Sequence, residues 1–179
     1  MRNIWQKLSR CYPLQVELIP IFLLLLTIYS TFASYPGLPD TIPMHFNSRG
    51  IPDGWGSRGS IFLFPALGFF LYVLLTISTV LLAVSRDPRR FINIPRKWKE
   101  GLTELQTERL RLFLCRSLLG MKLLIQGLVY YLLYGTIAVA LGRAEGLGGL
   151  LLPIIGAILA VDGYMVWHSF RIIRRHDPA

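Results

Sequence analysis

Charged residues are scarce in this chain, and they are unevenly spread. Only 16% of its 179 residues are Asp, Glu, Lys or Arg, whereas soluble domains average about a quarter. Long apolar runs without charge alternate with short charged segments. This alternation excludes an ordinary soluble domain and is typical of a protein that crosses a membrane several times. No internal repeat or separate soluble segment is evident, so residues 1–179 are expected to form one polytopic membrane domain.

Cysteine and histidine are also rare, with two and three residues respectively. Cys11 and Cys115 fall in segments that we place on the cytoplasmic side, where thiols stay reduced. The sequence has no CxxC and no Cys/His spacing typical of a zinc site. We therefore expect no disulfide, no bound metal and no cofactor.

The motifs of the common enzyme classes are missing as well. The sequence contains no glycine-rich phosphate loop, no HExxH and no nucleophile elbow. We assign no catalytic residue, and a non-enzymatic protein is favoured.

Four apolar segments approach or exceed the roughly 20 residues that a membrane-spanning helix needs. We predict spans at residues 14–34, 61–84, 118–141 and 150–170. The first could instead be a cleaved signal peptide, with Thr31-x-Ala33 as the cleavage site, but its length favours a retained helix. The predicted fold is an all-α integral membrane bundle of four helices, with a compact outer loop at 35–60 and a basic loop at 85–117.

Lysine and arginine gather on one side of these predicted spans. The N-terminal segment, the 85–117 loop and the C-terminal tail hold fifteen of them, and the other two loops hold three. Because cytoplasmic loops carry the excess of Lys and Arg, both termini and the basic loop are predicted inside and the 35–60 loop outside. The lipid bilayer, and anionic headgroups at the basic loop, are the expected partners; nucleic acid is not.

The basic loop itself divides at residue 103. Asp87-Pro88 and Ile94-Pro95 are expected to prevent a helix in its first half. Thr103-x-x-Gln106 then resembles a capping box, from which one helix can run without interruption into the third span.

The segment 38–60 is the only polar, turn-rich stretch between two apolar runs. Its prolines and glycines indicate a folded cap rather than a flexible tether. Residues 47–50 and residues 51–54 each have the composition of a type I turn. Tyr35 and Trp55 are expected to anchor this cap at the headgroups.

His45 is the most specific candidate for a site in this loop, and Asp40, Asn47, Asp53 and Trp55 accompany it as candidate ligand-binding residues. A histidine with carboxylates could act as a general base or bind a metal. A zinc site needs three or four close ligands, however, and this loop offers one imidazole and two carboxylates. The structural alternative is that Asp and Asn cap turns while His45 donates to a backbone carbonyl.

A second candidate cluster lies inside the membrane. An acid at the depth of Asp162 is costly, so it should face the bundle interior and have a partner. Counting along the spans places Gln126 at a similar depth and Lys122 one turn deeper. We predict a polar cluster of Lys122, Gln126 and Asp162, which would serve as a proton or ligand relay or as a structural clamp between helices.

Two further features of the spans carry expectations. The stripe of Gly156, Ala160 and Gly163 on the fourth span is expected to pack inside the monomer, since small residues permit close helix approach. Glu17 lies at the inner edge of the first span and is expected to be solvated.

The loop also resembles a known family. The pattern Leu38-Pro39-Asp40-x-Ile42-Pro43-x-His45-x-Asn47, followed by Gly50-x-Pro52-Asp53-Gly54-x-Gly56-Ser57, is similar to the first extracytoplasmic loop of the SdpI-like membrane proteins. These are bacterial toxin-immunity proteins and their relatives, whose N-terminal membrane unit is a domain of unknown function. The resemblance extends to Pro65 and covers roughly residues 18–125.

This resemblance implies a multi-pass protein of the bacterial inner membrane. It would act in toxin immunity or peptide sensing at the outer face, with a peptide toxin outside or a cytoplasmic regulator inside as its partner. Two other hypotheses stay open: a membrane-embedded enzyme that uses the His45 loop, and a small transporter or transporter accessory centred on Asp162.

Overall fold

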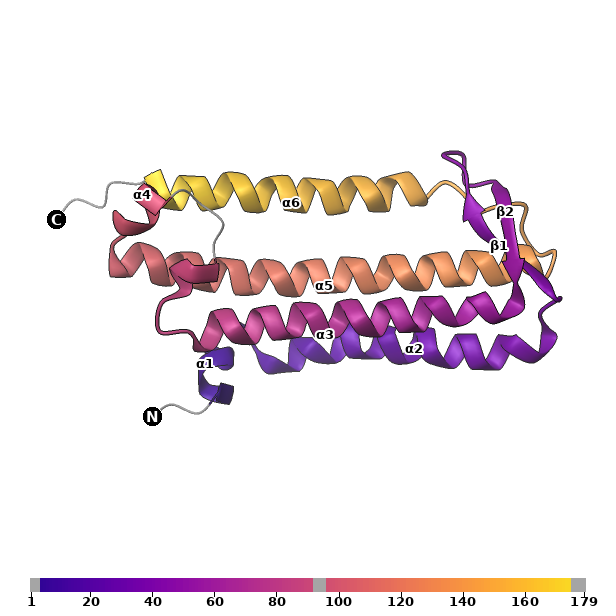
Figure 1. Cartoon of the computed structure of the whole chain (residues 1–179), viewed down its shortest axis with the longest axis horizontal. Coiled ribbons are helices and arrows are strands. Elements are labelled where there is room, and N and C mark those ends of the chain that lie inside the picture. Colours follow the sequence, from indigo (N-terminus) through magenta and orange to yellow (C-terminus); the bar gives the residue numbers. More distant parts are fainter. Residues whose placement is uncertain (1–3, 92–95, 175–179) are drawn as a thin grey trace.

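Four long helices dominate the computed structural model, which describes residues 4–91 and 96–174. They run side by side and are α2 (Leu18–Ser34), α3 (Leu63–Val84), α5 (Glu104–Ala140) and α6 (Leu151–Arg174) (Figure 1). Together with the short 3-10 turns that flank the first two, all four are long and apolar enough to cross a membrane, and the predicted spans fall on them. The fold is therefore a mostly helical bundle that is consistent with a multi-pass membrane protein.

Helix α5 is the centre of the bundle, because α2, α3 and α6 all pack against it. Its inner surface carries the buried side chains Leu119, Val129 and Leu133. The outward surfaces of α2 and α3 carry exposed aromatic residues such as Phe22 and Phe69. An apolar exterior of this kind suits contact with lipid, where it costs nothing.

A small β-hairpin joins α2 to α3, which the all-α prediction did not include. A 3-10 turn, η2 (Tyr35–Gly37), leads into strands β1 (Thr41–Phe46) and β2 (Pro52–Ser57), which pair antiparallel. A second 3-10 turn, η3 (Arg58–Phe62), leads from the hairpin into α3. The compact loop of the prediction is thus a two-stranded sheet seated at one end of the bundle (Figure 1).

Only one of the two predicted turns exists. The amide of Gly50 donates to the carbonyl of Asn47 at 2.9 Å, so the turn at residues 47–50 is confirmed. The predicted turn at residues 51–54 is wrong, because Pro52, Asp53 and Gly54 belong to β2. Proline and glycine are tolerated there because β2 is an edge strand and the pairing is irregular around His45.

The basic segment is more helical than predicted. A 3-10 turn, η4 (Pro88–Phe91), and a short helix, α4 (Arg96–Glu100), occupy it, whereas Ile94-Pro95 lies outside the described residues. The capping box is confirmed: the Gln106 amide donates to Thr103 Oγ1 at 3.2 Å, and the Thr103 amide donates to Gln106 Oε1 at 3.0 Å. From this cap, α5 runs for 37 residues into the membrane-spanning region.

The two ends of the bundle differ. Helix α1 (Ile4–Cys11), α4 and the C-terminal end of α6 lie at one end, and the hairpin lies at the opposite end (Figure 1). We call these the basic end and the hairpin end. The segments with many Lys and Arg residues belong to the basic end, and the two loops with few of them belong to the hairpin end.

Candidate functional sites: the hairpin and a buried ion pair

The hairpin is fixed to the bundle through its inner face. Ile42 is fully buried and packs with Leu38, Ile61 and Leu133, which brings β1 onto α5. The tip of the hairpin is held as well, because the Leu147 amide in the loop between α5 and α6 donates to the Gly50 carbonyl at 2.8 Å. The hairpin and the second loop therefore form one surface at this end of the molecule.

His45 and Asp53 meet on the outward face of this hairpin. His45 Nδ1 contacts Asp53 Oδ1, and the imidazole and carboxylate side chains are 73% and 43% exposed. His45 therefore pairs with a carboxylate and not with the backbone carbonyl that the structural alternative proposed. Gly54 makes this approach feasible, because a Cβ at that position would lie 2.8 Å from the Cβ of His45.

The other predicted residues of the loop do not join this pair. Asp40 is 95% exposed in its side chain and lies 3.8 Å from the Arg58 guanidinium. Asn47 Oδ1 accepts from the amides of Arg49 and Ile51 at 2.9 and 3.1 Å, as expected of a turn cap. Within residues 4–91 and 96–174, no three His, Cys, Asp or Glu side chains are grouped closely enough to hold a metal.

Trp55 gives the outward face an apolar surface. Trp55 is 60% exposed and alternates along β2 with half-buried residues. Ile51, just before β2, is 49% exposed. An exposed tryptophan and an imidazole–carboxylate pair thus lie on one small, well-supported sheet.

A second polar group of residues lies in the core near the basic end. Lys122 is completely buried, and its Nζ donates to both carboxylate oxygens of Glu17 at 2.8 and 2.9 Å. Tyr12 donates its hydroxyl proton to Glu17 Oε1 at 2.6 Å, and Lys122 Nζ also lies 4.9 Å from the ring centroid of Tyr72. The expectation of a solvated Glu17 is wrong, because only 18% of its side chain is exposed.

Gln126 is the only member of the predicted intramembrane cluster that lies buried near Lys122. Its Nε2 donates to the Gly68 carbonyl at 2.8 Å and so ties α5 to α3. Its Oε1 is buried and without a hydrogen-bond partner among the described residues. The Gln126 amide therefore joins two helices, which is the structural role that the prediction gave as the alternative to a relay.

The predicted pairing of Asp162 with Lys122 is wrong. Asp162 is exposed on α6, whereas Lys122 is buried on α5, pairs with Glu17 and lies over the ring of Tyr72 on α3. The residue count along the spans gave the depth of Asp162, but depth does not determine which face of α6 turns toward α5. The small-residue stripe of Gly156, Ala160 and Gly163 is likewise exposed, so it does not pack inside the monomer.

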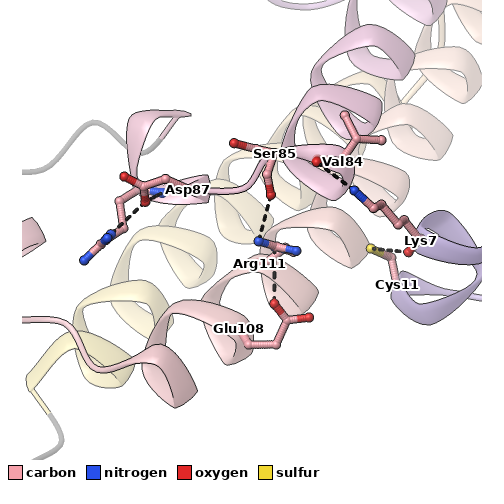
Figure 2. A network of polar contacts seen from close by, with 8 residues as sticks. Lys7, Cys11, Val84, Ser85, Asp87, Glu108 and Arg111 are labelled. Carbon is pink, nitrogen blue, oxygen red and sulfur yellow. Dashed lines mark hydrogen bonds and ion pairs between the residues drawn. The ribbon is translucent and has the colours of Figure 1, made fainter. Parts of the chain in front are cut away.

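Basic side chains near the basic end cap helix termini. Lys7 donates to the Val84 carbonyl at 3.1 Å and Arg111 donates to the Ser85 carbonyl at 3.0 Å, both at the C-terminal end of α3. Cations favour this position because the last carbonyls of a helix are unpaired and carry its negative dipole end. Figure 2 shows these contacts at the junction of α1, α3 and α5, with Arg111 also facing Glu108.

Tyr12 and Asp87, both near the basic end, have shifted pKa values. Burial and the hydrogen bond to the Glu17 carboxylate raise the pKa of Tyr12, which stays a neutral donor at physiological pH. The hydrogen bonds from Arg89 lower the pKa of Asp87, which therefore stays ionised. Both shifts keep the side chains in the protonation states that these contacts require.

Sequence reasoning missed the pairing of Glu17 with Lys122 and the contacts of Lys7 and Arg111 with the end of α3. Glu17 carried one usable signal, since it is the only acidic residue inside the first predicted span. An acid in a span calls for a partner, and Lys122 is the only lysine or arginine within the other predicted spans. Arg111 and Lys7 carried no such signal, because their acceptors are backbone carbonyls that any residue could supply.

These features define a class: a bundle of four long apolar helices, consistent with a multi-pass membrane protein, that carries a docked hairpin at one end and a buried ion pair in its core. A family model described as "Domain of unknown function (DUF1648)" matches residues 22–69, which comprise most of α2, the whole hairpin and the first two turns of α3. An uncharacterized protein of Archaeoglobus fulgidus is 37% identical over 84 residues, which is 46% of this chain and 44% of the relative. The chain thus aligns with less than half the length of that curated relative. No solved structure matches the chain.

Proposed function

We propose that this chain is a non-enzymatic membrane protein of the SdpI-like type, whose hairpin contacts a peptide in toxin immunity or peptide sensing. The observation that carries the proposal is the outward face of the hairpin. There Trp55 accompanies the His45–Asp53 pair on a sheet whose inner face packs against the bundle. The match of residues 22–69 to a family model supports it, because that stretch contains the entire hairpin.

This face has the properties of a peptide-binding surface. Exposed tryptophans are enriched among the residues that dominate binding energy, since they bury a large area with little loss of rotamer freedom. His45 and Asp53 add a hydrogen-bonding pair that can orient a polar group of the ligand. The burial of Ile42 and the Gly50–Leu147 contact hold the surface in place, so a ligand does not have to order it.

The proposal places the protein in the inner membrane of a bacterium, with both termini in the cytoplasm and the hairpin outside. The fifteen-to-three distribution of Lys and Arg between the two ends supports this orientation. A secreted peptide would then reach the hairpin directly from the outside. A cytoplasmic regulator would meet the basic end instead.

The proposal is tested by challenging bacteria that express the chain with a panel of secreted, membrane-active peptides. Expression should raise the inhibitory concentration of at least one peptide, and Trp55→Ala should weaken binding of that peptide to the purified protein about tenfold or more. Trp5→Ala is the matched control, because Trp5 is similarly exposed, at 65%, but lies in α1 at the basic end. Protection that is absent for every peptide, or that Trp5→Ala removes equally, would contradict the proposal.

A further inference from the structure

A groove of about 490 Å³ lies between α5 and α6 near the basic end, outside both sites described above. Its lining is basic and apolar: Arg109, Arg116 and Arg171 contribute fixed positive charge, and His168 is the fourth nitrogen-bearing side chain. Leu112, Phe113 and Ile172 supply the rest of the surface. None of the described residues that line the groove carries a carboxylate.

Two of the arginines are already oriented by the protein. Arg116 Nε donates to the Cys11 carbonyl at 2.8 Å, which fixes the plane of its guanidinium at the junction with α1. The guanidinium of Arg171 lies 5.4 Å from the ring centroid of Trp167 on the same helix. A guanidinium fork held in this way matches the geometry of a phosphate and loses less entropy when it binds one.

The apolar side of the groove is equally well defined. The ring of Phe113 lies against the imidazole of His168, with a centroid separation of 4.4 Å, so α5 and α6 are in contact at this level. One turn toward the hairpin end, the ring of Tyr164 on α6 lies 6.0 Å from Phe113 and 5.4 Å from His168 and is 53% exposed, so it extends the apolar wall of the groove. A ligand in the groove would therefore contact charge at the basic end and an apolar helix surface toward the middle of the bundle.

We propose that this groove binds the headgroup phosphate of an anionic phospholipid, with the lipid's acyl chains lying along α6. Basic pockets between spanning helices are where such headgroups bind, because the phosphate meets paired arginines while the chains stay in hydrocarbon. The charge of the lining, its apolar continuation along α6 and its place near the basic end all match this one ligand. A free phosphate would use only the first of these features.

Tryptophan fluorescence gives a direct test. Trp167 is 55% exposed and contacts Arg171, so it reports on the groove when Trp5, Trp55 and Trp98 are replaced by Phe. This protein is reconstituted into phosphatidylcholine vesicles that contain brominated phosphatidylglycerol or brominated phosphatidylcholine. The quenching of Trp167 should show a clear preference for the anionic lipid.

Arg109→Gln with Arg171→Gln should reduce that preference about tenfold, while Arg116 keeps its cap on α1. Arg86→Gln with Arg90→Gln is the matched control, since it removes the same charge from the basic segment outside the groove. Equal losses in both double variants would show general attraction to the basic end and would overturn the proposal. Thermal melting of both variants verifies that they are folded.

Adding inorganic phosphate distinguishes a lipid headgroup from a free anion as the ligand of the groove. Millimolar phosphate added to the vesicles should leave the preference for phosphatidylglycerol unchanged if the groove is built for a lipid. If phosphate abolishes the preference and raises the melting temperature of the protein in pure phosphatidylcholine vesicles, the groove takes a free anion and the lipid proposal fails.

Discussion

Lys122 and Glu17 show how a single pair of residues can determine packing in the core. The ammonium group has no exposed surface, and both oxygens of one carboxylate accept hydrogen bonds from it. Taking such charges out of water is costly, and only the partner offsets the cost. The pair consequently fixes the position of the segment around Glu17 against α5 and specifies which helices meet.

Removing one partner of this pair should be worse than removing both. We expect Lys122→Met to destabilise the protein by about 3 kcal/mol, because it leaves the Glu17 carboxylate buried without a counter-charge. Adding Glu17→Gln should recover part of this loss. Unfolding in mixed micelles measures Lys122→Met, Glu17→Gln and the double variant, and Lys99→Met in α4 controls for the loss of one lysine charge. A double variant whose loss equals the sum of the two single losses would show that the residues are not coupled.

Gly54 should matter more than the histidine that it faces. The His45–Asp53 contact is largely solvent-exposed, so His45→Ala should cost well under about 1 kcal/mol. Gly54→Val should cost more, because even its Cβ would come within 2.8 Å of the His45 Cβ and displace a paired strand. Thermal melting compares the two variants. If His45→Ala lowers the melting temperature more than Gly54→Val does, the prediction is wrong and His45 contributes more to stability than its exposure suggests.

At the level of elements, α5 and α6 differ although both are apolar and long. Helix α5 buries residues along most of its length, whereas α6 has no fully buried residue in its described part. The difference lies in their neighbours: α5 packs against all three of the other long helices, whereas α6 has its main contacts with α5. An apolar composition therefore indicates that a helix has apolar surroundings, but it does not indicate how many other helices pack against it.

Glycines on these two helices should respond in opposite ways to an added methyl group. Gly163 on α6 has nothing within 4 Å of an added Cβ, so Gly163→Ala should stabilise the helix by up to about 1 kcal/mol. Gly135 on α5 faces Leu147, whose Cδ2 would lie 2.4 Å from the new Cβ, so Gly135→Ala should be destabilising unless Leu147 moves. Thermal melting in the same detergent compares the pair. A destabilising Gly163→Ala would reveal a contact on α6 that the monomer lacks.

At the scale of the whole molecule, the bundle has a hairpin end and a basic end that the chain reaches alternately. The four long helices return the chain to the basic end, where α1 and the end of α6 both lie (Figure 1). An even number of long helices places the first and last described helices at the same end, which agrees with the distribution of Lys and Arg. This arrangement also brings α1, the C-terminal end of α3 and α5 together at the basic end, where Lys7, Arg111 and Arg116 cap helix ends.

The orientation in the membrane is tested with introduced cysteines. In a background where Cys11 and Cys115 are replaced by Ala, Ser48→Cys should react with an impermeant thiol reagent in intact cells, because Ser48 is exposed at the tip of the hairpin. Arg90→Cys, exposed at the basic end, should react only after the membrane is permeabilised. The opposite labelling pattern would invert the orientation that the positively charged residues predict.

The features that the sequence alone determined are those that depend on neighbours along the chain. A run of apolar residues specifies a spanning helix, Thr103 and Gln106 form their capping box within one turn, and Asn47 closes its own tight turn. Each of these structures is complete within a few residues or one helix. No distant partner is needed to form them, so their pattern can be identified before the fold is known.

Only the tertiary structure decided which side chains meet across the bundle. Glu17 and Lys122 are 105 positions apart, and Gln126 reaches a carbonyl 58 positions away. Asp162 has a predicted depth that suits Lys122, yet α6 turns it outward. The physical reason is that sequence fixes the rise along a helix, whereas the rotation of each helix about its axis is set by packing against all its neighbours at once.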